Sequence, residues 1–132
     1  MITFGLASPA LGEYLLPSRL RSPLVNRPVD VSLLGLETFL PLLHSTFRAR
    51  SANSAGTSMI LMEATDRTRV TEPEQPLLEA FSLLFWSGTN RFLPQETYLF
   101  QHNEIGEFPL FIVPVNRRRR YQVYEAVFNR FA

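Results

Sequence analysis

Two histidines and two aspartates are the residues of this 132-residue sequence that could support metal binding or a hydrolytic triad. His44 and His102 are not spaced as HxxxH or HExxH, and a zinc site needs three or four ligands. A triad would have to use Asp30 or Asp66, and no GxSxG motif marks a nucleophilic serine. Cysteine and lysine are absent, which excludes thiolate chemistry and Schiff bases. We predict no metal, no cofactor and no catalytic residue.

Paired carboxylates could catalyse glycoside hydrolysis, but here they fall in expected loops. Glu72 and Glu74 lie in a proline-containing segment, and Glu104 and Glu107 flank a turn. Glu125 differs because it lies in an apolar, strand-like segment, where a buried carboxylate needs a partner. We expect Glu125 to face solvent or to pair with an arginine. The arginines considered as its partners are Arg48 and Arg50.

Four consecutive arginines form the most visible motif: Arg117, Arg118, Arg119 and Arg120. They fall between two expected strands and should therefore form a hairpin tip. Arginine binds carboxylates and phosphates bidentately, so the run indicates an anionic partner; a solvated tip that protects a strand edge is the alternative. Nucleic acid is not favoured, because the net charge is only +1 and no broad basic face is evident.

Six short segments have the character of β-strands, and short connections join them. They are residues 45–50, 57–64, 81–86, 97–102, 108–115 and 121–128. The connections leave no room for crossover helices, so antiparallel pairing is expected. A short helix is expected within 36–43, where apolar residues recur with helical spacing and Pro41 limits the length. The predicted fold class is mainly β: a small antiparallel barrel or sandwich with one short helix and an extended N-terminal arm.

Two of the expected strands, 81–86 and 108–115, are apolar on both faces. A strand in a simple two-layer sheet has one polar face. The outer face must therefore be covered by the helix, by the arm or by another chain, because a large exposed apolar patch is unusual for a monomer. Pro109 and Pro114 indicate an edge or bulged position in 108–115. The pattern predicts a protein partner or a homo-oligomer.

The chain is expected to comprise an extended arm, residues 1–32, and a compact β domain, residues 33–132. Four prolines interrupt the arm, which still carries large apolar side chains. Those predicted to bind a partner are Phe4, Leu6, Tyr14, Leu15 and Leu16. We expect no membrane span, since no stretch reaches about 20 apolar residues. The N-terminus lacks the basic start of a secretory signal, so a cytoplasmic location is expected.

Five sequence pieces, taken in order over residues 33–129, resemble a small bacterial family of uncharacterised β-rich domains. The pieces are FxPLxxSTF, FSLLF, LPQxTY, LFxVP and YEAVFN. The sequence departs from the family pattern at His44 and Glu96, where the family has glycine, and at Ser87. The resemblance implies a compact β-rich domain without an assigned activity. It also implies a structural or accessory role, since family members lie near genes for phage-tail-collar-like proteins.

The sequence therefore favours a non-enzymatic structural or interaction protein. It would be an accessory subunit of a larger assembly, held through apolar strand faces and the arm. Two alternatives stay open. One is a ligand-binding domain or enzyme with an aromatic-lined pocket. The other is an anion- or nucleic-acid-binding module that uses Arg117–Arg120.

Overall fold

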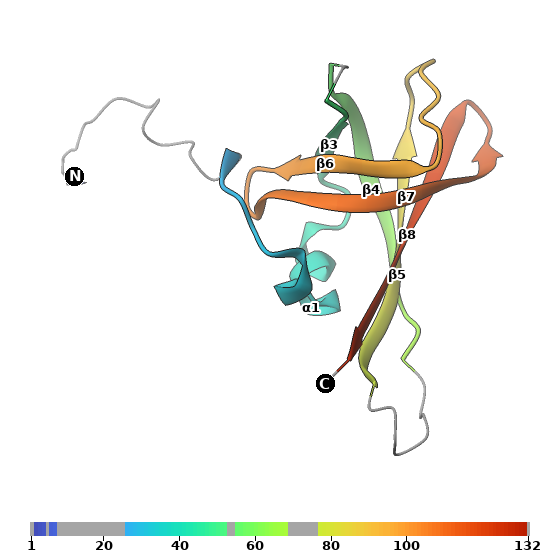
Figure 1. The fold of residues 1–132 in the computed structure, drawn as a ribbon. Helices are drawn as coiled ribbons and strands as arrows, with labels where there is room; N and C mark the ends of the chain where they lie inside the picture. The colour runs from blue at the N-terminus through green and yellow to red at the C-terminus, as the bar shows by residue number, and fades with distance from the viewer. Residues whose placement is uncertain (1, 5, 8–25, 53–54, 69–76, 132) are drawn as a thin grey trace. The chain divides into compact units, whose positions relative to one another are not determined.

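A computed structural model describes residues 2–4, 6–7, 26–52, 55–68 and 77–131. The chain divides into two compact units. Unit 1 comprises Met1–Val29 and Gln101–Glu107, and unit 2 comprises Asp30–Phe100 and Phe108–Ala132. Figure 1 shows the chain as a ribbon, coloured from the N-terminus to the C-terminus.

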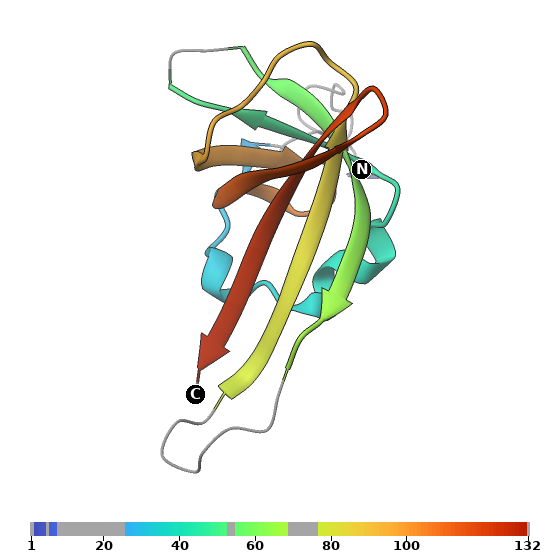
Figure 2. The same cartoon turned by 90° about the vertical axis from the view of Figure 1, so that its right-hand side faces the viewer.

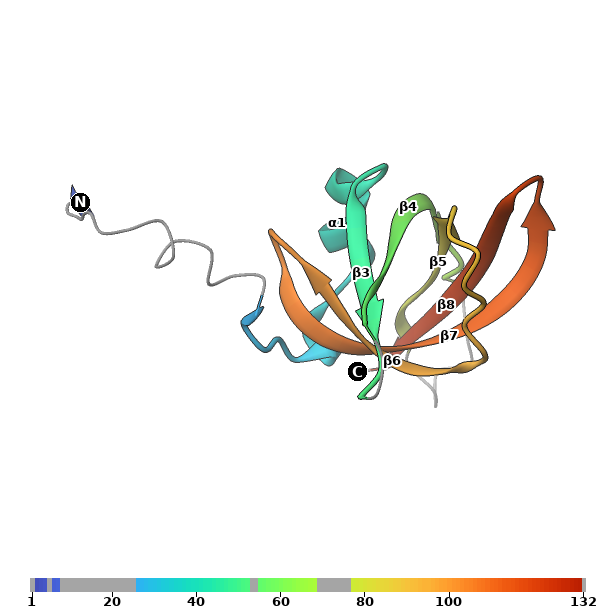
Figure 3. The same ribbon diagram turned by 90° about the horizontal axis from the view of Figure 1, so that it is seen from above.

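Unit 2 is built on six antiparallel strands in one sheet, which closes in a ring (Figure 3). The strands are β3 (Thr46–Arg50), β4 (Thr57–Asp66), β5 (Leu77–Ser87), β6 (Glu96–His102), β7 (Gly106–Arg118) and β8 (Tyr121–Phe131). Their order around the ring is β3-β4-β5-β8-β7-β6. The long strands β4, β5 and β8 lie side by side (Figure 2). The predicted fold class is confirmed, and each predicted strand lies almost entirely within an observed one.

Unit 1 contains the turn between β6 and β7 and the described end of the arm. The strands β1 (Ile2–Phe4) and β2 (Leu6–Ala7) form a parallel pair. Val29 N donates a hydrogen bond to Glu107 O at 2.8 Å, and Glu107 N donates one to Arg27 O at 2.7 Å. The described end of the arm therefore adds a short parallel pairing to this turn. Tyr14, Leu15 and Leu16 lie outside the described residues, as do the side chains of Phe4 and Leu6.

The helical part of unit 2 consists of three short turns. They are η3 (Val31–Leu33), α1 (Leu36–Phe39) and η4 (Leu40–Leu42). The expected helix over 36–43 forms as one α-turn followed by one 3-10 turn. Pro41 lies at the start of the 3-10 turn, where its missing N–H costs no helical hydrogen bond. The Glu79 carboxylate accepts a hydrogen bond from Leu36 N at 3.2 Å and so holds the start of α1.

The inside of the ring is filled by aromatic side chains, and Phe39 of α1 occupies its centre. Phe39 is fully buried, and its ring lies 5.6–6.4 Å from four other phenylalanine rings. Those four are Phe47, Phe81, Phe108 and Phe128. Such tilted and edge-on pairs are favourable beyond the area they bury. The helix therefore belongs to the core, although it is only one turn long.

His44, in the turn between η4 and β3, has a left-handed backbone with φ of 71°. Its N–H donates a hydrogen bond to Leu61 O at 2.7 Å, which fixes the turn against β4. Glycine adopts such a φ without steric cost, whereas a residue with a Cβ does not. The turn therefore keeps its shape with histidine, at a cost in backbone strain.

We predict that His44→Gly raises the free energy of unfolding by roughly 1 kcal/mol, because glycine removes the left-handed strain. Urea denaturation of the full chain measures this change. His44→Ala is the matched control, since alanine retains a Cβ and should give no increase. An equal gain in both variants would show that the histidine side chain, not the backbone, causes the cost.

We predict that Phe39→Ala lowers the free energy of unfolding by about 3–5 kcal/mol, because it leaves a cavity among four aromatic rings. The neighbouring Leu40 is 45% exposed, so Leu40→Ala should cost much less. Chemical denaturation compares the two variants. A similar loss in both would contradict the central role of Phe39 in the core.

Candidate protein-binding surface

A row of apolar side chains crosses the outer face of four neighbouring strands. In register, Ile60 of β4 pairs with Trp86 of β5, Trp86 with Val123 of β8, and Val123 with Val115 of β7. Paired residues of neighbouring strands project to the same face, so these four side chains lie side by side. Ile60 is 39% exposed and Val115 37%, whereas Val123 between them is only 1% exposed.

Tyr121 extends this row at the start of β8. Its ring centroid lies 5.5 Å from that of Trp86, and its side chain is partly exposed. We call Ile60, Trp86, Val115, Tyr121 and Val123 the tryptophan patch. The second face of these strands is thus apolar, as the sequence indicates. The helix does not cover it, since α1 buries Phe39 inside the ring.

The four arginines form the hairpin tip between β7 and β8, where the sequence predicts them. Arg118 pairs with Tyr121, and Arg119 and Arg120 form the two-residue turn. All four are exposed, and none of their guanidinium groups makes a hydrogen bond or ion pair with another residue in the part of the chain that the structure describes. Arg119 has a φ of 57°. The tip therefore concentrates four unneutralised charges.

A cavity of about 560 Å³ joins the arginine hairpin to the tryptophan patch. Its lining consists of Trp86, Arg117, Arg118, Arg119 and Tyr121. The Trp86 Nε1 atom is buried and has no hydrogen-bond partner, although buried indole N–H groups are normally paired. The sequence prediction named the arginines as partner-binding residues but missed Trp86. Strand alternation, which puts this single tryptophan on the outer face, was the signal available.

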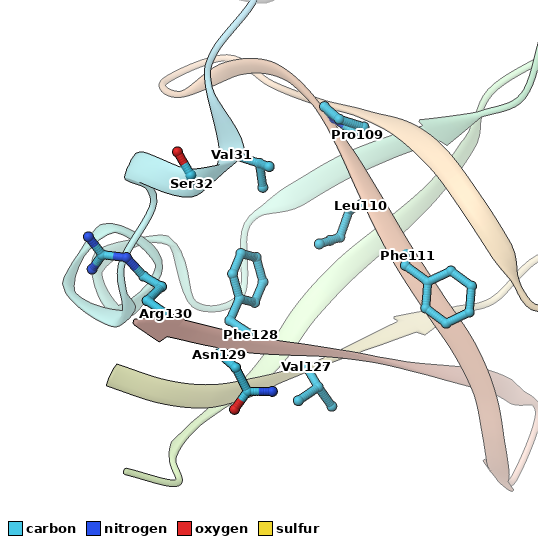
Figure 4. A pocket seen from close by; sticks show the side chains of 9 residues that line it. All are labelled: Val31, Ser32, Pro109, Leu110, Phe111, Val127, Phe128, Asn129 and Arg130. Carbon is cyan, nitrogen blue, oxygen red and sulfur yellow. The ribbon is translucent and has the colours of Figure 1, made fainter. Parts of the chain in front are cut away.

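A second cavity, of about 530 Å³, lies between η3 and the strands β7 and β8 (Figure 4). The two strands part here, because their pairing ends at Val113 and Glu125. Two of the three polar side chains that line it are engaged elsewhere. Ser32 Oγ donates to Asp30 Oδ1 at 2.7 Å, and the Arg130 guanidinium donates to Glu79 at 3.1 Å. The third, Asn129, is exposed. The lining therefore offers no pair of free polar side chains for catalysis.

Asp30, Asp66 and His102, which were considered for metal or triad chemistry, make local hydrogen bonds that stabilise turns. Asp30 and Asp66 are exposed and each accepts a hydrogen bond from the backbone N–H two residues ahead; with the hydroxyls of the same residues, these bonds lower both aspartate pKa values. His102 is buried, and its Nδ1 accepts a hydrogen bond from Glu104 N at 3.0 Å. Within the described ranges, no three metal-ligating side chains come together.

Glu125 has a different partner from those the sequence suggested. Its carboxylate lies 4.0 Å from the Arg67 guanidinium, which also donates to Ser82 Oγ at 2.7 Å. Arg48 and Arg50, the suggested partners, belong to β3, which lies opposite β8 in the ring. Strand order, which local sequence does not reveal, explains the difference. Glu72 and Glu74 lie outside the described residues.

No helix in the described segments is long and apolar enough to cross a lipid bilayer.

We predict that His102 contributes to loss of stability in mild acid. Burial lowers its pKa below the ordinary value of 6.5. As the pH falls below about 6.5, the unfolded chain therefore takes up this proton before the folded chain does, and the free energy of unfolding decreases. The decrease ends once the pH falls below the lowered pKa. It should be smaller in His102→Asn.

Urea denaturation at pH 7.5, 6 and 5 measures this dependence. His44→Asn, which replaces the exposed histidine, is the control. An unchanged pH dependence in His102→Asn would contradict the assignment to His102.

Comparison with family models matches residues 34–128 to a domain of unknown function (DUF6916). No curated protein and no solved structure matches the chain. The matched region begins just before α1 and ends within β8, so it contains the central Phe39 and most of the ring. It also contains the tryptophan patch and the arginine hairpin. Because the match covers most of the chain, the protein belongs to this DUF6916 family of domains of unknown function.

Proposed function

We propose that this protein is a non-enzymatic interaction protein, an accessory subunit that binds a protein partner through the tryptophan patch. The observation that carries the proposal is the unbroken apolar row across β4, β5, β8 and β7. Aromatic residues and arginine are enriched at protein interfaces. The patch and its neighbouring hairpin supply both. The accessory role implied by the family resemblance agrees with this proposal.

The burial pattern of the patch supports a macromolecular partner. Val123 is already buried in the free protein, while Ile60 and Val115 on its two sides are over one third exposed. The exposed apolar side chains therefore rest on a packed base and could be desolvated by a partner. Because the row lies on paired strands, it is rigid before binding, and little ordering is needed.

The N-terminal arm is the second predicted anchor. The residues proposed for it are Phe4, Leu6, Tyr14, Leu15 and Leu16. Its described end is already held by the hydrogen bonds of Arg27 and Val29 with Glu107. An arm fixed at this point would give the partner a second contact in addition to the tryptophan patch. Because both contacts belong to one chain, the overall affinity would rise without any change in the patch.

A ligand-binding or enzymatic role has less support. The ring interior is filled by phenylalanine side chains, among them Phe47, Phe85 and Phe100, all fully buried. The cavity beside η3 lacks free convergent polar groups, which small-molecule sites use to fix orientation.

We predict that Val115→Asp and Ile60→Asp each weaken partner binding at least tenfold. Each places a charge in an apolar interface, yet both positions are already partly exposed, so folding should change little. Tagged full-length proteins are used to capture the partner from the native host, and the affinity for the purified partner is then measured. Leu33→Asp is the matched control, since Leu33 is 72% exposed on η3, outside the patch.

Equal partner binding by wild type, Val115→Asp and Ile60→Asp would refute this assignment of the surface. Circular dichroism and thermal unfolding of each variant establish that its fold is retained.

A further inference from the structure

The arginine hairpin has a conformation that its residues do not favour. Arg118 pairs with Tyr121, which leaves Arg119 as the first residue of a two-residue turn with φ of 57°. Turns of this length favour glycine, asparagine or aspartate at positions with positive φ. An arginine there is strained, and four adjacent positive charges repel one another. A requirement for positive charge at this tip would account for both costs.

Protection of a strand edge accounts for only part of the charge. β7 has 13 residues and its neighbour β6 has 7, so the end of β7 next to the tip is paired with β8 but extends beyond β6. Charges at Arg117 and Arg118 could protect this edge. Arg119 and Arg120 lie in the turn, beyond both strands, where no strand edge needs protection.

The lining of the cavity beside the hairpin is largely apolar, and its polar side-chain groups are mainly hydrogen-bond donors. Guanidinium groups and the indole N–H donate and do not accept, and only the Tyr121 hydroxyl among the lining polar side-chain groups can do both. The Trp86 N–H is buried without an acceptor. The three lining arginines make no ion pair with a described residue. A ligand rich in acceptors and negative charge is the chemical complement of this lining.

The surroundings of the cavity favour a protein carboxylate over a nucleic-acid phosphate as its anionic ligand. Outside the hairpin, the chain has nine arginines and twelve acidic residues, so the positive charge is confined to one tip. Nucleic-acid binding normally uses a broad basic face. On its other side, Trp86 adjoins the exposed apolar side chains of Ile60 and Tyr121. Acidic residues interspersed with apolar ones fit both parts of this surface.

We infer that the cavity between Trp86 and the arginine hairpin binds the carboxylates of an acidic, partly apolar segment of a partner protein. This inference rests on the proposed function and adds the chemistry of the partner. The apolar side chains of the segment contact the tryptophan patch. Its carboxylates pair with the guanidinium groups of Arg117, Arg118 and Arg119.

Trp86 is the single tryptophan of the chain, so its fluorescence reports binding directly. Full-length protein is titrated with a synthetic peptide in which glutamate alternates with leucine and phenylalanine. The matched probes are the same peptide with glutamine at every glutamate and a single-stranded oligothymidylate of equal length. We expect the acidic peptide to bind at least tenfold more tightly than the glutamine peptide, and more weakly at high salt.

Two variants test the hairpin itself. Arg118→Gln combined with Arg119→Gly should weaken binding of the acidic peptide at least tenfold. Arg119→Gly alone should weaken it about threefold while raising the urea midpoint of unfolding, because it removes both a charge and the left-handed strain. Opposite changes in stability and affinity cannot come from misfolding. Arg27→Gln, which removes one charge from unit 1, is the control and should bind as the wild type does.

Three outcomes would overturn this inference: no binding of the acidic peptide, equal binding of both peptides, or tighter binding of the oligothymidylate. The proposed function fails differently, through partner binding that is indifferent to Val115→Asp. If Val115→Asp weakens partner binding and the acidic peptide does not bind, the proposed function stands and the carboxylate inference is wrong.

Discussion

The interior of a six-stranded ring is narrow, and filling it is the constraint on which this structure depends. Strands alone do not fill it here, since Phe39 enters the centre from a single helical turn. Phe47 and Phe85, from strands β3 and β5, stack edge to face at 5.3 Å, and Phe85 contacts Phe100 of β6 at 5.1 Å. The aromatic contacts therefore connect α1 with strands all around the ring, which makes so short a helix stable.

The helix that carries Phe39 is held at its start by charged residues of the sheet. Glu79 of β5 accepts hydrogen bonds from Leu36 N and from Arg130 of β8. A Cβ at Gly35 would lie 3.0 Å from the Glu79 carboxylate, so a larger residue there would require the Glu79 side chain to shift slightly. With the core closed in this way, the large remaining apolar surface lies outside the ring. This is the physical reason for placing function on the outer face of the sheet.

Local patterns predict the strands but not their neighbours. Short apolar segments bounded by turn residues locate β5 and β8. Within β5, the alternation of side chains between the two faces places Trp86 on the outer face. Ile60 and Val115 lie near Trp86 because their strands, β4 and β7, are neighbours in the same sheet. Glu125 illustrates the same limit: its partner Arg67 follows directly after β4, whereas the arginines of β3 lie across the ring. The order of the strands depends on how the whole ring closes, so the sequence of a single strand does not predict its neighbours.

Two residues other than glycine have left-handed backbones, among those that the structure describes, and they differ in what surrounds them. His44 closes a turn through its bond to Leu61 O, so its strain has a structural explanation. Arg119 lies beside a buried indole N–H without an acceptor and among charges without partners. Strain alone is weak evidence of function. Here strain and charge repulsion coincide, and an anion bound at the hairpin would relieve the repulsion. These costs of the free hairpin favour the proposed binding role over a purely structural one.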